Sequence, residues 1–73
     1  MEEKTKELRS ILIRLLNGLG FPKPRIMLTM AIITAYQIEQ EMVDWVATYY
    51  GKEDTLTTQA FMSKLNALTT PNN

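Results

Sequence analysis

Two carboxylates three residues apart, Glu41 and Asp44, come nearer to a chemical site than any other pair in this 73-residue sequence. Residues three apart share one face of a helix, so the pair could hold a hard cation or act as general acid and base. A solvated helix face explains the same pattern, and no calcium-binding loop or Glu-x-x-His motif accompanies it. We therefore predict that the protein is not an enzyme and uses no catalytic residue, metal or cofactor.

Histidine and cysteine are both absent from the chain. Their absence excludes a structural zinc site, a disulfide and the common nucleophile–base pairs. Gly18-Leu19-Gly20 lacks the Lys-Ser or Lys-Thr of a phosphate-binding loop. A core of this size supplies only about 3–5 kcal/mol of stability, and small domains often add a disulfide, a metal or a second subunit. Self-association is the supplement that the composition leaves open.

The segment Thr57–Thr70 resembles the first helix and turn of a helix-turn-helix motif, through its Thr-x-x-x-Phe opening and the run Leu65-Asn66-Ala67-Leu68-Thr69. The resemblance implies a small DNA-associated regulator, which we keep as the alternative function. The motif needs a second helix to read DNA, and only three residues follow Thr70. The chain also has no net charge, whereas domains that bind phosphates are usually strongly basic. We therefore expect no specific nucleic-acid partner.

The charges are distributed unevenly along the chain. Residues 26–50 contain three acidic residues, Glu39, Glu41 and Asp44, and no basic one. This layout favours docking between helices of one chain or antiparallel self-association. The basic residues of the first third are Lys4, Lys6, Arg9, Arg14, Lys23 and Arg25.

The longest apolar stretch, Ile26–Tyr36, has 11 residues. A membrane-spanning helix needs about 20, so we predict no membrane association. The first residues carry charges of both signs, and no cleavage site follows an apolar run. These features predict a cytoplasmic protein.

Apolar residues recur at helical spacing throughout the chain. Residues that end helices interrupt the pattern at Asn17-Gly18, at the two prolines on either side of residue 23 and at Gly51. We predict an all-α protein, a compact bundle of four short helices. Residues 1–68 form one domain, and residues 69–73 form a frayed tail. The predicted helices are residues 3–17, 24–33, 35–50 and 58–68, the last capped by Thr57.

The division between the second and third helices is placed at Thr34. Thr34 and Gln37 have the spacing of a capping box, and Ile33 and Ile38 have that of a hydrophobic staple. If Thr34 does not break the chain, the bundle has three helices. The second helix is apolar on every side, which predicts a position in the middle of the core or in an interface.

The third predicted helix has a core stripe of Ile38, Met42, Trp45 and Tyr49. A second apolar strip lies beside it, and a single neighbouring helix cannot cover both. Either the first and fourth helices cover the third helix from opposite sides, or the second strip is an interface. Tyrosines at its two ends combine a large ring with a polar tip, which is common at interfaces. Methionines on apolar helix faces are expected to fill the core; they are Met27, Met30, Met42 and Met62. The interface candidates are Tyr36, Val43, Val46 and Tyr50.

These features together predict a small, non-enzymatic protein–protein interaction module. Its expected partner is a second copy of the same chain, most simply in a homodimer, or another protein.

Overall fold

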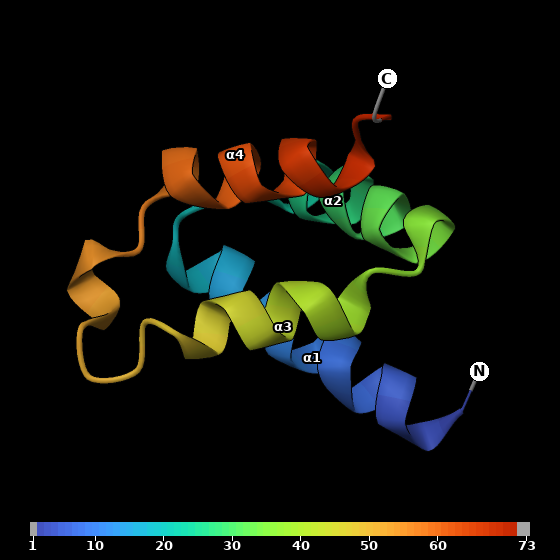
Figure 1. Ribbon diagram of the computed structural model, residues 1–73, viewed down its shortest axis with the longest axis horizontal. Coiled ribbons are helices and arrows are strands. Elements are labelled where there is room, and N and C mark those ends of the chain that lie inside the picture. Colours follow the sequence, from blue (N-terminus) through green and yellow to red (C-terminus); the bar gives the residue numbers. More distant parts are fainter. Residues whose placement is uncertain (1, 72–73) are drawn as a thin grey trace.

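The computed structural model describes residues 2–71, which contain four α-helices, one short 3-10 helix and no strand. The all-α fold of four short helices is thereby confirmed. Helices α1 and α3 lie in one half of the molecule, and α2 and α4 in the other (Figure 1). None of the described helices is long and apolar enough to cross a membrane. The elements are α1 (Glu3–Gly18), α2 (Lys23–Tyr36), α3 (Glu39–Ala47), η1 (Glu53–Thr55) and α4 (Thr58–Thr69).

A single apolar core joins all four helices. Helix α1 packs closely against both α2 and α3. Burial on α1 therefore centres on Leu12 and Leu16, between its two neighbours, whereas Ile11 is 37% exposed. The tail predicted for residues 69–73 begins inside α4, and Asn72 and Asn73 lie outside the described residues. The buried apolar side chains are Leu12, Leu16, Phe21, Met30, Ile33, Ile38, Met42, Leu56, Phe61 and Leu65.

Helix α1 ends in a Schellman turn around Gly20, which has φ +90°. The Phe21 amide donates to the Leu16 carbonyl at 3.1 Å, and the Gly20 amide donates to the Asn17 carbonyl at 3.0 Å. Leu16 and Phe21, five residues apart, are both buried, which is the apolar contact that accompanies this motif. The predicted stop at Asn17-Gly18 was close, but Gly20 is the residue with the left-handed conformation.

Helix α2 ends in the same kind of turn, and this corrects the predicted break at Thr34. The Ile38 amide donates to the Ile33 carbonyl, and the Gln37 amide donates to the Thr34 carbonyl, both at 3.1 Å. Gln37 has φ 55° and ends the helix. Thr34 lies inside α2, where its hydroxyl donates to the Met30 carbonyl at 2.8 Å and caps nothing. The bundle keeps four helices because the chain breaks three residues later.

The incorrect placement of the helix break at Thr34 has a specific physical cause. A staple joins two apolar residues five apart at a helix start, and a Schellman turn joins two apolar residues five apart at a helix end. Ile33 and Ile38 satisfy both patterns, so the spacing alone does not say which end of a helix it marks. The left-handed conformation of Gln37 decides it, and this residue type gives little warning of such a conformation.

Replacing the left-handed residue by glycine tests this turn. Gln37→Gly should raise the free energy of unfolding by about 0.5–1 kcal/mol, because a left-handed conformation strains an L-residue and does not strain glycine. The matched control is Gln40→Gly inside α3, which should lower the free energy of unfolding by about 1 kcal/mol. Urea unfolding followed by circular dichroism measures both. Equal losses in the two variants would mean that Gln37 is ordinary helix.

Helix α4 begins where the sequence predicts. The Thr57 hydroxyl accepts a hydrogen bond from the Ala60 amide at 3.0 Å, as an N-cap should. The Phe61 ring lies edge-on to Phe21 and to Trp45, with ring centroids 6.2 Å apart in each pair. Trp45 also meets Tyr49 at 5.1 Å. Trp45 is half-buried and packs against the core, so its predicted place on the core stripe is confirmed.

The connection from α3 to α4 turns at Gly51, which has φ +84°. The Gly51 amide donates to a carboxylate oxygen of Glu53 at 3.0 Å. This hydrogen bond favours the ionised carboxylate and lowers the pKa of Glu53 below its ordinary value. Beside this turn, Tyr50 is 89% exposed and contributes nothing to the core.

Candidate functional site

Helix α2 exposes much of its apolar surface. The segment Ile26–Tyr36 contains no charged residue, yet only Thr29, Met30 and Ile33 within it are buried. Met27 and Leu28 are 65% and 64% exposed. A single exposed leucine is unremarkable, but a continuous exposed apolar surface usually marks an interaction site. The prediction that this helix lies in the middle of the core is therefore wrong.

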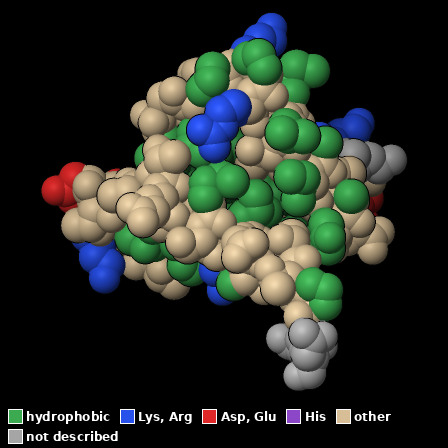
Figure 2. All heavy atoms as spheres, turned by 90° about the horizontal axis from the view of Figure 1, so that it is seen from above, with side chains coloured by type: hydrophobic (Ala, Val, Ile, Leu, Met, Phe, Trp, Pro, Cys, Tyr) green, Lys and Arg blue, Asp and Glu red, His purple; other side chains and the backbone are tan. Residues whose placement is uncertain are grey.

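The exposed arc of α2 divides into two parts because residues 27 and 28 lie about 100° apart around the helix. One part, the outer strip, faces away from α1. The other part faces α1 and forms one wall of a groove. Figure 2 shows hydrophobic side chains gathered on the face that carries α2 and α4, with acidic side chains at its edges. The outer strip consists of Leu28, Ile32, Ala35 and Tyr36.

The outer strip has a regular helical spacing. Leu28, Ile32 and Tyr36 follow one another at intervals of four, so they form one ridge along α2. Leu28 and Tyr36 are 64% and 54% exposed, while Ile32 is half-buried against the core. Ala35 beside the ridge is exposed and small enough to let another helix approach. The ridge is apolar and uncharged from end to end.

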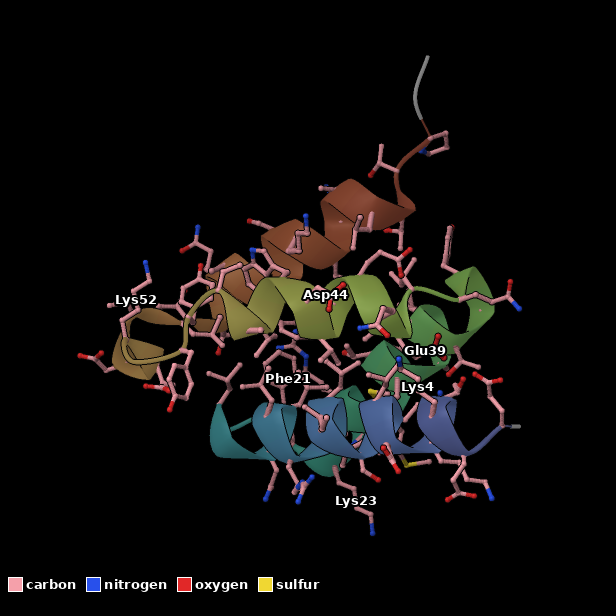
Figure 3. All side chains as sticks on the ribbon, turned by 60° about the horizontal axis from the view of Figure 1, so that its bottom comes forward. Lys4, Phe21, Lys23, Glu39, Asp44 and Lys52 are labelled. Atoms are coloured by element: carbon pink, nitrogen blue, oxygen red, sulfur yellow. The ribbon has the colours of Figure 1, made fainter. Side chains whose placement is uncertain are left out.

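The groove lies between α1 and α2 and has a volume of about 610 Å³. Its floor and walls are largely apolar, and three basic side chains line it. No acidic side chain lines it. In Figure 3, Lys23 lies beyond α1 and points away from the bundle. The lining residues are Arg9, Ile13, Arg14, Asn17, Lys23, Ile26, Met27, Met30 and Ala31.

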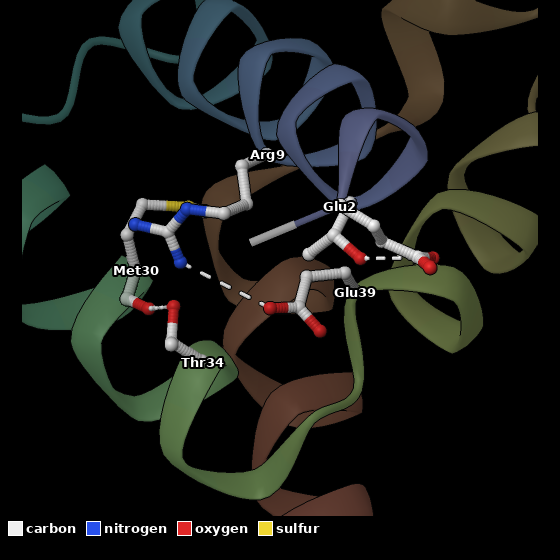
Figure 4. A network of polar contacts seen from close by, with 6 residues as sticks. Glu2, Arg9, Met30, Thr34 and Glu39 are labelled. Carbon is white, nitrogen blue, oxygen red and sulfur yellow. Dashed lines mark hydrogen bonds and ion pairs between the residues drawn. The ribbon is translucent and has the colours of Figure 1, made fainter.

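One basic residue of the groove is already paired. Arg9 Nη1 lies 3.9 Å from a carboxylate oxygen of Glu39 (Figure 4). Glu39 is buried in the first turn of α3, where the helix dipole favours a negative charge. The distance is too long for a hydrogen bond, and Arg9 Nη1 has no acceptor among residues 2–71. Arg14 and Lys23 form no ion pair with any described residue.

The structure does not bring the four interface candidates together on one helix. Tyr36 is the last residue of α2, and Tyr50 lies three residues beyond the end of α3. Val43 and Val46 lie on α3 and pack, half-buried, against the core. The predicted helix 35–50 would have aligned all four residues. The chain instead turns at Gln37 and leaves the helix after residue 47, so only Tyr36 joins the exposed α2 surface.

The carboxylate pair lies on the solvent side of α3, where Figure 3 shows Asp44. Both Glu41 and Asp44 are exposed, and Asp44 accepts a hydrogen bond from the Gln40 amide nitrogen at 2.8 Å. Within residues 2–71, no three acidic side chains are placed to hold a metal ion together. The geometry therefore adds no further ligand to this pair.

Sequence reasoning missed Met27 and Leu28 as surface residues. Met27 was expected to fill the core, and the structure corrects this, since Met30 and Met42 are buried but Met27 is not. The available signal was the uncharged run Ile26–Tyr36. Its apolar residues cover more of the helix circumference than one buried face would require. A helix that is apolar all round carries no asymmetry to show which side faces outward.

Comparison with known proteins identifies no relative. No protein-family model matches the chain, and no curated protein or solved structure matches it significantly.

Proposed function

We propose that this protein is a non-enzymatic interaction module that self-associates through the outer strip of α2. The observation that carries the proposal is the exposure of Leu28 and Tyr36, at 64% and 54%, within the uncharged residues 26–36 of α2. A small domain without disulfide or zinc has little stability to spare, and covering apolar surface would add to it.

A second copy suits this strip better than a charged partner. The outer strip has no charge, so two copies can approach without like-charge repulsion. An antiparallel pairing of two α2 helices would place Leu28 of each copy near Tyr36 of the other. Ala35 leaves room for the two helix axes to come close. This pairing is two-fold symmetric, which is the commonest form of a homodimer.

The dimer should be of modest affinity. Helix α2 has 14 residues and is therefore about 21 Å long. One helix pair of that length buries less than the roughly 800 Å² per partner of a standard stable interface. We expect a dissociation constant of about 1–100 µM, which is equivalent to about 5–8 kcal/mol.

Sedimentation equilibrium between about 5 and 500 µM tests the proposal, and this range brackets the affinity expected from the interface size. The wild type should change from monomer to dimer across it. Leu28→Glu should remain monomeric and keep its helical circular dichroism, because Leu28 is already mostly exposed. The control is Gln59→Glu, which adds one charge to an exposed position of α4 and should dimerise normally. A wild type that stays monomeric throughout would refute self-association, and so would a dimer that survives Leu28→Glu.

The alternative of a DNA-associated regulator gains no supporting observation. Helix α4 contains one basic residue, Lys64, and buries Phe61 and Leu65 in the core. Its Thr57 cap is an ordinary helix start and needs no DNA to explain it. Self-association is therefore the function that the surface supports better.

A further inference from the structure

We propose that the groove between α1 and α2 binds an acidic amphipathic helix of a second protein. This binding site is separate from the outer strip, and it does not depend on self-association. It would make the module an adaptor that holds a partner helix on one side of α2.

The shape of the groove fits a helix. One wall carries Arg9, Ile13 and Asn17 at intervals of four along α1, and the other carries Lys23 and Met27 along α2. Eight residues of helix span about 12 Å, so the groove is about two turns long. Two neighbouring helices leave a furrow of this kind, into which the apolar ridge of a third helix packs.

The apolar lining of the groove is adaptable. Met27 is 65% exposed at the edge of the groove, and Met30 is buried at its base. Methionine side chains are flexible and polarizable, and they are common where one surface accepts different apolar side chains. Ile13 on the opposite wall is 41% exposed. The groove can thus cover two or three apolar side chains of a ligand helix.

The basic residues that line the groove favour a negatively charged ligand. Arg14 and Lys23 line the groove without an ion-pair partner among residues 2–71, whereas Arg9 is paired with Glu39. No acidic residue lines the groove. Carboxylates flanking the apolar face of a bound helix would meet these cations, which would set its orientation and speed its association more than raise its affinity.

A second copy of this chain does not fit the groove. Its α2 is uncharged between residues 26 and 36, so it offers nothing to Arg14 or Lys23. Its α3 is acidic on the outside, at Glu41 and Asp44, but it turns Met42 into its own core. Neither of these helices combines acidic flanks with an exposed apolar ridge, which favours a helix of another protein. A flat lipid surface fits a concave groove less well than a helix does.

The probe is a synthetic two-turn helix, stapled, with leucines three and four residues apart and glutamates on both flanks. Its control has lysines in place of the glutamates. Fluorescence anisotropy should give a Kd of about 10–100 µM for the glutamate peptide, in the range of small interfaces, and at least tenfold weaker binding for the lysine peptide. Amide shifts in NMR spectra should change at Ile13, Met27 and Ala31, and not at Ile32 or Ala35.

Two doubly substituted proteins make the test specific. The double substitution Arg14→Glu with Lys23→Glu should weaken binding of the glutamate peptide at least tenfold and should strengthen binding of the lysine peptide. Lys52→Glu with Lys64→Glu changes the net charge equally outside the groove and should leave both affinities within about twofold, since distant charges are screened. Circular dichroism confirms that each protein is folded.

The same titrations are repeated on Leu28→Glu. Peptide binding by this variant supports the groove whether or not the wild type self-associates. Equal binding of the two peptides, no binding of either, or shifts confined to the outer strip would each overturn the proposal. Binding to phosphatidylserine vesicles without binding to the peptide would also overturn it, because the groove would then recognise a membrane.

Discussion

Phe61→Ala is expected to leave most of the protein unfolded at 25 °C. Phe61 is fully buried and meets two other aromatic rings, Phe21 and Trp45, at 6.2 Å each. Removing a buried phenylalanine ring costs about 3–5 kcal/mol, and a domain of this size has only about 3–5 kcal/mol in total. The loss is also concentrated on α4, which reaches the core mainly through Phe61 and Leu65.

Urea unfolding and near-ultraviolet circular dichroism measure this effect. The matched control is Tyr50→Ala, which removes an aromatic ring that is 89% exposed and should change the stability by less than about 0.5 kcal/mol. If Phe61→Ala folds with nearly wild-type stability, α4 does not pack on the core as described.

Ile38→Ala should cost about 2–4 kcal/mol, the second largest effect that we expect. Ile38 is 8% exposed and belongs to the core while also closing the turn after α2. Its removal leaves a cavity and loses the apolar contact with Ile33 that accompanies the Schellman turn. The turn and the core are therefore weakened by one substitution.

The same chemical change on the surface is the control. Ile13→Ala removes an isoleucine side chain that is 41% exposed on α1, and it should cost less than about 1 kcal/mol. Thermal unfolding of the two variants under identical conditions gives the comparison. Equal losses would show that Ile38 makes no special contribution to the turn or to the core.

The fold could be predicted from the sequence wherever a local signal has one meaning. The Thr57 cap and the end of α1 near Gly18 each depend on residue types with clear helix-end preferences. The division of residues 25–50 was predicted correctly as a break and placed incorrectly at Thr34. Two isoleucines five residues apart fit both a helix start and a helix end, and Gln37 is not a residue type that announces a left-handed turn.

The candidate site was predictable only in outline. The uncharged run Ile26–Tyr36 marks α2 as either core or interface, but it does not show which side of α2 is covered. That side is decided by contacts with α1 and by the direction in which the chain turns at Gln37. The basic residues of the groove come from separate elements, Arg14 from α1 and Lys23 from α2, so no pattern along one helix reveals them.

The order of the helices has a consequence for how fast the chain folds relative to the proposed self-association. Helix α1 packs against α2 and α3, which follow it directly along the chain, and the connectors between the three span only residues 19–22 and 37–38. The chain is all-helical with short connectors, and all-helical chains of this kind fold in microseconds to milliseconds. Collision between two copies at micromolar concentration is slower, because typical association rate constants are about 10⁵–10⁷ M⁻¹s⁻¹. In the proposed self-association, each copy would therefore present a finished α2 before it meets a second copy, and folding and assembly would be separate kinetic steps.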